Sequence, residues 1–162
     1  MRIHVPVTLR WSDIDAYAHV NNVAMLRLLE EVRIRAFWSA GDPADGSDDV
    51  ALQGPAILDG RPGSNSISLI AHQQAQYLRP IPYQREPLDI EVWIGRIGGS
   101  SLQLCYEVYS AVGAEPRTLF TRAESTLVLA DAATSTPRRI TDAERAAWQP
   151  YVEEPVDFTR RR

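Results

Sequence analysis

The residues best suited to chemistry lie in one short segment, from Arg10 to Asn22, which reads RWSDIDAYAHVNN. It contains two carboxylates, one imidazole and two amides. Alternating apolar residues before it predict a strand with one buried face, and the residues after it, as far as Trp38, read as a helix capped by Asn21 or Asn22. A helix start carries unpaired N–H groups and about half a positive charge, which favours an electron-rich oxygen there. The segment is therefore a place where a strand gives way to a helix and where chemistry can be done.

Two elements must position this segment. The strand before it is predicted over Ile3 to Trp11, with every second residue apolar. The helix after it is apolar around much of its circumference, so it needs a sheet curled around it. Gly41 is expected to stop the helix, and the Gly-, Pro- and Asp-rich stretch from Asp42 to Gly63 predicts a long loop.

The rest of the chain predicts four more strands and a short helix. Alternation marks strands at 67–77, 88–94, 102–108 and 117–129, with a hairpin turn at Gly98-Gly99-Ser100 between the second and third of these. Thr141, followed three residues later by Glu144, predicts a capped C-terminal helix. The order β-α-β-β-β-β, with one apolar helix for antiparallel strands to cover, is typical of an α+β fold.

Composition excludes several classes of function. The chain of 162 residues has a formal net charge of −4 and a pI near 5.4, which gives no support to nucleic-acid binding, and the run Arg160 to Arg162 reads as a solvated basic tail. Cys105 is the only cysteine, so no internal disulfide forms, and we expect it to be inert packing in a cytoplasmic protein. No signal peptide or membrane span is predicted. Three scattered histidines and one cysteine predict no metal site, and we expect no bound redox cofactor.

The pattern resembles the hot-dog fold thioesterases, specifically the 4-hydroxybenzoyl-CoA thioesterase-like acyl-CoA thioesterases. The segment Asp13 to Asn22 matches their D-x-D-x-x-G-H-V-N-N motif, with weaker support from Tyr77-Leu78-Arg79-Pro80 and from Ile97-Gly98-Gly99-Ser100-Ser101. The resemblance implies one hot-dog domain over 1–162: an antiparallel sheet of about five strands wrapped around a long central helix, with a core at about 3–130 and a short helix and basic tail at 141–162. The chain departs from the motif at Ala18, where the family usually has glycine. If that position needs a positive φ, alanine costs about a kilocalorie per mole; if it only lets a ligand approach, the methyl group narrows the site.

The resemblance also implies hydrolysis of acyl-CoA or acyl-carrier thioesters to free acid and thiol. Asp15 would act as nucleophile or as general base, with His19 and Asn22 as further catalytic candidates. Backbone N–H groups around Ala18 to Val20 would polarise the carbonyl. The substrate-binding candidates are Tyr17, Ala18, Val20, Arg79, Ser100 and Ser101, with Arg96 and Arg122 as further candidates to meet the phosphates of coenzyme A, which is part of the substrate and not a cofactor.

Plainer roles stand beside these. Asp13 is expected to cap the turn or pair with Arg10, and the two asparagines are helix caps first. Two other functions stay open: a hot-dog dehydratase, although a histidine-led motif would be expected there, and a non-catalytic acyl-CoA-binding protein. The resemblance implies a homodimer or homotetramer with sites built between subunits, and neither nucleic acid nor membrane as a partner.

Overall fold

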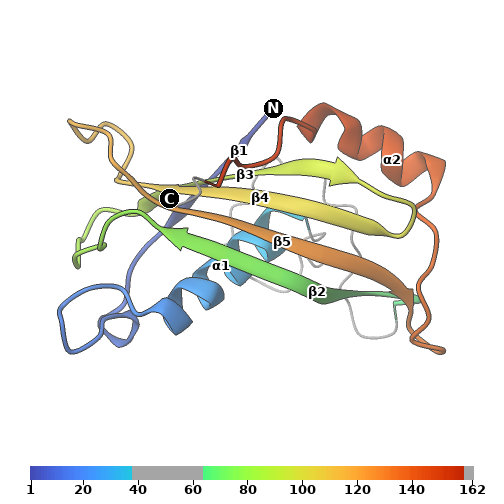
Figure 1. Cartoon of the computed structure of the whole chain (residues 1–162), viewed down its shortest axis with the longest axis horizontal. Coiled ribbons are helices and arrows are strands. Elements are labelled where there is room, and N and C mark those ends of the chain that lie inside the picture. Colours follow the sequence, from blue (N-terminus) through green and yellow to red (C-terminus); the bar gives the residue numbers. More distant parts are fainter. Residues whose placement is uncertain (38–63, 159–162) are drawn as a thin grey trace, which may run out of the picture.

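The computed structural model of the protein describes residues 1–37 and 64–158, which form one five-stranded antiparallel sheet with helix α1 (Asn22–Phe37) across one face (Figure 1). The strands are β1 (Ile3–Val7), β2 (Ser66–Tyr77), β3 (Leu88–Ile97), β4 (Ser101–Tyr109) and β5 (Leu119–Asp131). Their order in the sheet is β1-β3-β4-β5-β2, so β1 and β2 are the edges. The predicted element order and α+β class are confirmed, whereas the extent of the domain over 1–162 stays a prediction.

The core lies between α1 and the inner face of the sheet. Six apolar residues of α1 are buried against the sheet, namely Met25, Leu28, Leu29, Val32, Ala36 and Phe37. Leu26 and Ile34 keep 38% and 37% of their surface exposed, so α1 is less widely buried within this chain than its composition predicts. The sheet therefore covers one broad face of the helix and leaves Val23, Leu26 and Ile34 outside it.

The first strand is shorter than the sequence predicts. β1 ends at Val7, and residues Trp11 to Asp13 form a turn of 3-10 helix. Trp11, expected on the buried face, is 74% exposed and stacks on Tyr83 with the ring centroids 4.3 Å apart. The expectation was wrong because hydrogen bonds local to the Arg10–Asp13 turn end the extended conformation before Trp11.

Strand β2 changes face at a bulge. Alternation over 67–77 predicts one shared face for Ile67, Leu69, Ala71, Ala75 and Tyr77, and this is wrong because the register shifts between Ile70 and His72. Leu69 pairs with Val128, next to the core residue Leu129, and so faces away from α1, whereas Ala75 pairs with the core residue Ala123 and faces α1. An alternation of apolar and polar residues in the sequence does not reveal the extra residue of a bulge, after which the side chains change face.

The remaining local predictions agree with the structure where it describes them. Strands β3 and β4 pair antiparallel across the predicted turn, Cys105 is buried, and helix α2 (Asp142–Trp148) has Thr141 as its N-cap in a capping box with Glu144. Within the described residues no helix is long and apolar enough to cross a membrane. The predicted stop at Gly41, the loop 42–63 and the tail 160–162 lie outside the described residues.

Candidate active site

The loop between β1 and α1 is held by two side chains that act on backbone groups. Asp13 is 4% exposed; its Oδ2 accepts a hydrogen bond from the Arg10 N–H at 2.7 Å, and its carbonyl accepts from the Asn21 N–H at 2.8 Å. The Asn21 side chain accepts from the Val23 N–H at 2.8 Å and so caps α1, as does Asn22 at 3.0 Å. The structural roles predicted for Asp13 and the asparagine caps are confirmed.

Asp15 is the carboxylate of this loop that stays available. Its Oδ1 accepts hydrogen bonds from the backbone N–H groups of Tyr17 at 2.8 Å and His19 at 3.2 Å. The Asp15 N–H donates to the His19 carbonyl at 2.8 Å, which closes the turn. In the described part of the chain no other hydrogen bond reaches this half-buried carboxylate. One oxygen is thus fixed by the backbone while the second is free to act.

Ala18 occupies the left-handed region, with φ of 62°. Its N–H donates to the Asp15 carbonyl at 3.1 Å, so the positive φ belongs to the tight turn from Asp15 to His19. This conformation favours glycine, because a Cβ atom crowds the backbone there. Of the two explanations for the family's glycine, the backbone requirement therefore applies in this chain.

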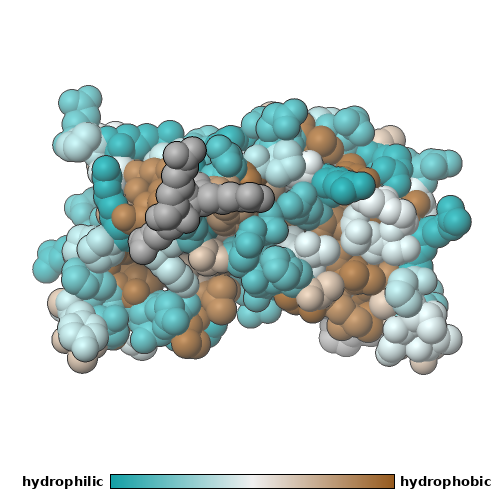
Figure 2. Space-filling model, viewed as in Figure 1, coloured by the Kyte–Doolittle hydropathy of each residue, from teal (hydrophilic) through white to brown (hydrophobic). Residues whose placement is uncertain are grey.

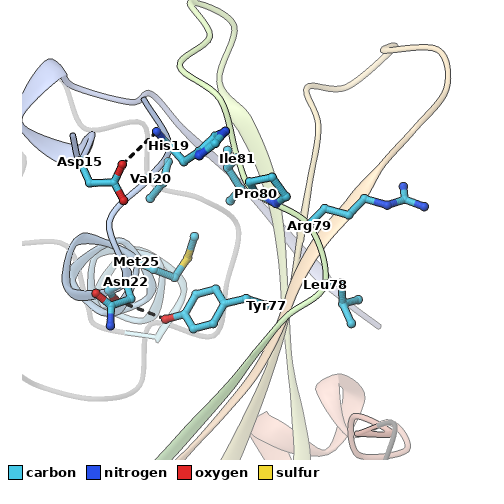
Figure 3. Close-up of a pocket in the computed structure, with 10 residues that line it drawn as sticks. All are labelled: Asp15, His19, Val20, Asn22, Met25, Tyr77, Leu78, Arg79, Pro80 and Ile81. Carbon is cyan, nitrogen blue, oxygen red and sulfur yellow. Dashed lines mark hydrogen bonds between the residues drawn. The ribbon is translucent and has the colours of Figure 1, made fainter. Parts of the chain in front are cut away.

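A cleft of about 400 Å³ opens between this loop, the start of α1 and the end of β2 (Figure 3). It brings together five of the predicted site residues, Asp15, His19, Val20, Asn22 and Arg79. In Figure 3 the His19 ring is directed away from the Asp15 carboxylate, toward the Pro80–Ile81 segment, and the Arg79 guanidinium points outward. The cleft walls are completed by Met25, Tyr77, Leu78, Pro80 and Ile81.

Tyr77 is the functional candidate that sequence reasoning missed. It closes the cleft opposite α1, and its hydroxyl lies 3.4 Å from the Asn22 carbonyl, a long hydrogen bond (Figure 3). Burial raises the pKa of Tyr77 above its ordinary value, so the hydroxyl stays protonated and can donate at neutral pH. The Tyr77-Leu78-Arg79-Pro80 match was the available signal, but only Arg79 was given a role from it.

Other predicted residues are not brought to this cleft. Tyr17 and Ala18 are exposed and do not line it. Ser101 lines a separate depression of about 440 Å³ with Arg96, Gly98, Gln103 and Thr126. Ser101 pairs with Val128, and Val128 with Leu69, eight residues before Tyr77, which places Ser101 and its neighbour Ser100 roughly 25 Å from the cleft.

The backbone donors expected at the cleft are already engaged. The N–H groups of Ala18, His19 and Val20 donate to the Asp15 carbonyl, the Asp15 carboxylate and the Ile81 carbonyl, at 3.1, 3.2 and 2.9 Å. That they polarise a substrate carbonyl stays a prediction, because all three N–H groups already have acceptors within the protein. Their local role is to shape the turn that holds Asp15. Arg122 is likewise engaged, with Glu107 at 3.1 Å and the Asp157 carbonyl at 3.0 Å.

Within residues 1–37 and 64–158, one group of residues of the types that ligate metals lies elsewhere, on the outer face of the sheet. Ligand atoms of His4, Asp89 and Glu91 lie within 4.8 Å of one another. Arg117 Nη2 donates to both carboxylates, at 2.7 Å to Asp89 and 2.6 Å to Glu91. A guanidinium of the chain itself therefore compensates their charge.

The sequence model of the thioesterase-like superfamily matches residues 9–156, and the chain belongs to this superfamily. The membership supports thioester hydrolysis as the general class of reaction. A relative from Bacillus subtilis strain 168, the uncharacterized protein YsmA, is 32% identical over 101 residues. That match covers 62% of this chain and 56% of YsmA, so it spans little more than half of the relative's length.

Solved structures show the same fold at low identity. The PA5185 protein of Pseudomonas aeruginosa superposes with a TM-score of 0.71 at 20% identity, covering 96% of this chain and all (100%) of the other. A thioesterase superfamily protein of Jannaschia sp. CCS1 gives 0.67 at 20%, covering 90% and 79%. A thioesterase of Thermus thermophilus, complexed with coenzyme A and Zn, gives 0.62 at 22%, covering 92% and 93%. The predicted hot-dog architecture is thereby confirmed.

Proposed function

We propose that the protein hydrolyses acyl-CoA thioesters in the cleft beside Asp15. The observation that carries this is the Asp15 carboxylate, in which one oxygen accepts two backbone hydrogen bonds and the other is free at the edge of a cleft. A carboxylate held in one orientation is what a general base or a nucleophile needs.

Both routes lead to the same products. As a general base, Asp15 takes a proton from water, the oxygen of that water attacks the thioester carbonyl, the C–S bond breaks, and the thiolate leaves. As a nucleophile, Asp15 attacks the carbonyl directly and forms an anhydride, which water then hydrolyses. The thiolate leaves readily in either case, so the carbonyl oxygen is the group that most needs stabilisation.

The N–H groups of residues 18–20 already have acceptors, so the donors that we consider for that oxygen are the side chains that line the cleft. The Tyr77 hydroxyl and the His19 ring both line the cleft. Each can donate a hydrogen bond in its neutral form, and among the described residues the Tyr77 hydroxyl has one partner, the Asn22 carbonyl, at a long 3.4 Å. We assign polarisation of the substrate carbonyl to these two side chains. Asn22 caps the start of α1 with its side chain and positions the Tyr77 hydroxyl with its carbonyl.

Coenzyme A as the carrier is supported by the structure of the Thermus thioesterase, which is complexed with it. Arg79 at the cleft mouth offers a guanidinium for phosphate, while Ser100 and Ser101 require a second chain to reach an Asp15 cleft. Membership of the 4-hydroxybenzoyl-CoA thioesterase-like group, the identity of the acyl group, a cytoplasmic location and the lack of a metal or redox cofactor stay predictions.

The test is hydrolysis of a panel of acyl-CoAs by Asp15→Asn and Asp15→Ala. Loss of the charge should lower kcat by about 10²-fold or more. Asp142→Asn, an exposed carboxylate in the first turn of α2, is the matched control and should keep full activity. Near-normal turnover by folded Asp15→Asn would exclude Asp15, and hydration of enoyl-CoA or binding without turnover would favour the dehydratase or the acyl-CoA-binding alternative.

A further inference from the structure

A group of polar side chains is buried between α1 and the sheet, away from Asp15. Arg33 on α1 is 5% exposed, Tyr106 on β4 is fully buried and Ser125 on β5 is 1% exposed. Arg33 Nη2 donates to Glu30 at 3.3 Å, but neither Arg33 Nη1 nor the Tyr106 hydroxyl has a hydrogen-bond partner in the described part of the chain. A buried donor without an acceptor costs about 1–3 kcal/mol, so two together call for a function.

These side chains adjoin one another. Burial raises the pKa of Tyr106, while the positive charge of Arg33 and weak hydrogen-bonding interactions of the phenol oxygen with Arg33 and Ser125 act in the opposite direction. The phenol therefore stays protonated as a donor beside a guanidinium. Gln73 of β2 donates to Ser125 Oγ at 3.1 Å and ties the edge strand to the group. Two donors converge there, and an oxygen acceptor is the complementary ligand.

The inner face of the sheet connects this group to the Asp15 cleft. Tyr77, which lines the cleft, pairs with Thr121; the next inward pair is Ala75 with Ala123, and the next is Gln73 with Ser125. Along these two strands the inward side chains between the cleft and the polar group are the methyl groups of Ala75 and Ala123, which belong to the same core as the buried α1 residues Met25 and Leu29. Thr121 Oγ1 on this path is also buried without a hydrogen-bond partner in the described residues.

The helix gives the same separation as the strands. Four residues of β2, from Tyr77 to Gln73, span about 13 Å. On α1, Met25 lines the cleft and Arg33 lies eight residues further along, about 12 Å. Tyr106 pairs with Ala123, the middle residue of the path. Arg33 on the helix and the Gln73–Ser125 pair on the sheet thus lie at a similar distance from the cleft, and Tyr106 lies beside the middle of the path.

We propose that the acyl group of the substrate runs along this path and ends in an oxygen acceptor, most strongly a carboxylate, bound by Arg33 Nη1 and the Tyr106 hydroxyl. The proposal deepens the proposed function and rests on it for the position of the thioester. A buried polar site discriminates strongly against an analogue that lacks its partner, because the donors then stay unpaired. The preferred substrates are thioesters of acids with a distal carboxylate or carbonyl.

The test compares acyl-CoAs matched in chain length, adipyl, suberyl and sebacyl against hexanoyl, octanoyl and decanoyl. For the best-fitting length, kcat/KM should favour the distal carboxylate by about ten- to a hundredfold. Tyr106→Phe and Arg33→Met should bring that ratio close to one. Tyr109→Phe, whose hydroxyl bonds Glu107 at 2.8 Å on the outer face, and Arg35→Met, whose Nη1 bonds the Pro6 carbonyl at 3.0 Å, are matched controls that should keep it.

Calorimetric binding of suberate and octanoate separates this proposal from the catalytic one. Preference for suberate that both substitutions remove supports the subsite even if no thioester is hydrolysed, in which case only the proposed function fails. Equal binding, no binding, or a preference that survives both substitutions overturns the subsite. Thermal unfolding completes the test: a purely structural hydroxyl predicts that Tyr106→Phe lowers the Tm, whereas an unpaired one predicts an equal or higher Tm. Should Arg33→Met fail to fold, Tyr106→Phe decides the outcome.

Discussion

Two aspartates separated by a single residue do different work in this protein. The buried Asp13 carboxylate accepts a hydrogen bond from the Arg10 N–H, whereas Asp15 is half-buried and, among the described residues, one of its carboxylate oxygens accepts no hydrogen bond. The difference comes from the turn between Asp15 and His19, which directs its N–H groups at the Asp15 carboxylate. The same turn explains why Ala18, three residues after Asp15, has a positive φ.

His19 is expected to position the thioester and not to attack it. Its ring lines the cleft but is directed away from the Asp15 carboxylate (Figure 3). His19→Ala should therefore lower kcat less than Asp15→Ala, because the attacking or activating carboxylate remains. Steady-state kinetics of both variants measure the order, with Asp142→Asn as control; an acyl adduct trapped on His19 by mass spectrometry would reverse the assignment.

Ala18→Gly should stabilise the fold. Alanine at φ of 62° carries strain of about 1 kcal/mol, which glycine removes. The greater conformational entropy of glycine in the unfolded chain offsets part of this gain in stability. We expect the free energy of unfolding in urea to rise by up to about 1 kcal/mol. Ala146→Gly, in the interior of α2, is the opposite control and should cost about 1 kcal/mol. A lower stability for Ala18→Gly would mean that the methyl group makes contacts worth more than the strain.

At the scale of elements, the outer face of the sheet is joined by ion pairs that cross strands. Arg2, just before β1, donates to Glu91 on β3 at 2.8 Å and to Glu107 on β4 at 2.7 Å, and its guanidinium lies 3.8 Å from the ring centroid of Trp93. Arg117, just before β5, reaches Glu91 from the other side at 2.6 Å. These contacts fasten the short edge strand β1, which has only five residues.

This arrangement makes stability depend on pH. Burial raises the pKa of Glu91, but hydrogen bonds from Arg2 and Arg117 outweigh it and hold the pKa below the ordinary value of 4.5. A depressed folded-state pKa contributes stability that is present above pH 4.5 and is lost as the pH falls through the lower, folded-state value. The β1–β3–β4 network should therefore weaken in acid and not in base.

Glu91→Gln should destabilise the protein by about 2 kcal/mol at pH 7, because two charged hydrogen bonds are lost. Urea unfolding at a series of pH values measures the difference from wild type, which should shrink below pH 4.5 as Glu91 itself becomes protonated. Glu86→Gln, at an exposed position, should unfold like wild type throughout. A difference that is constant with pH would mean that packing, and not charge, sets the cost.

At the scale of the whole molecule, one chain holds its candidate groups at two ends of the sheet. Asp15, in the loop before α1, lies beside the end of β2. Ser101, the first residue of β4, is level with the beginning of β2, roughly 25 Å away. β2 is an edge strand with exposed Ile67, Leu69 and Ile70, and Figure 2 shows apolar surface over its first part. Antiparallel pairing of two β2 strands would cover this surface and bring Ser101 of one chain toward Asp15 of the other.

We therefore predict a homodimer, with pairing into a tetramer left open. Light scattering at micromolar concentration should give at least twice the chain mass of 18.1 kDa, and Ile70→Lys should yield monomers with reduced activity. Ile34→Lys, at a comparably exposed apolar position on α1, is the control. Hybrids of Asp15→Ala chains with chains carrying Ser101→Glu should regain part of the activity; absence of rescue, or a fully active monomer, would place each site within one subunit.

The sequence by itself determined the features that depend on neighbours along the chain. The cap at Asn21, the capping box of Thr141 with Glu144, the β3–β4 turn and the role of Asp13 each use hydrogen bonds that span a few residues. Residue types and spacing specify such contacts directly. The position of Asp15 at the strand-to-helix junction was predictable for the same reason.

Only the tertiary structure decided which distant residues meet. The bulge after Ile70 sets which side chains of β2 face α1, and the β5–β2 pairing brings Tyr77 against the start of α1. The engaged loop N–H groups and the Arg33–Tyr106 pair were also beyond sequence reasoning, since period-two and helical patterns give the face of a residue but not its partner across the core. Those partners follow from strand order and register, which join residues far apart in the chain.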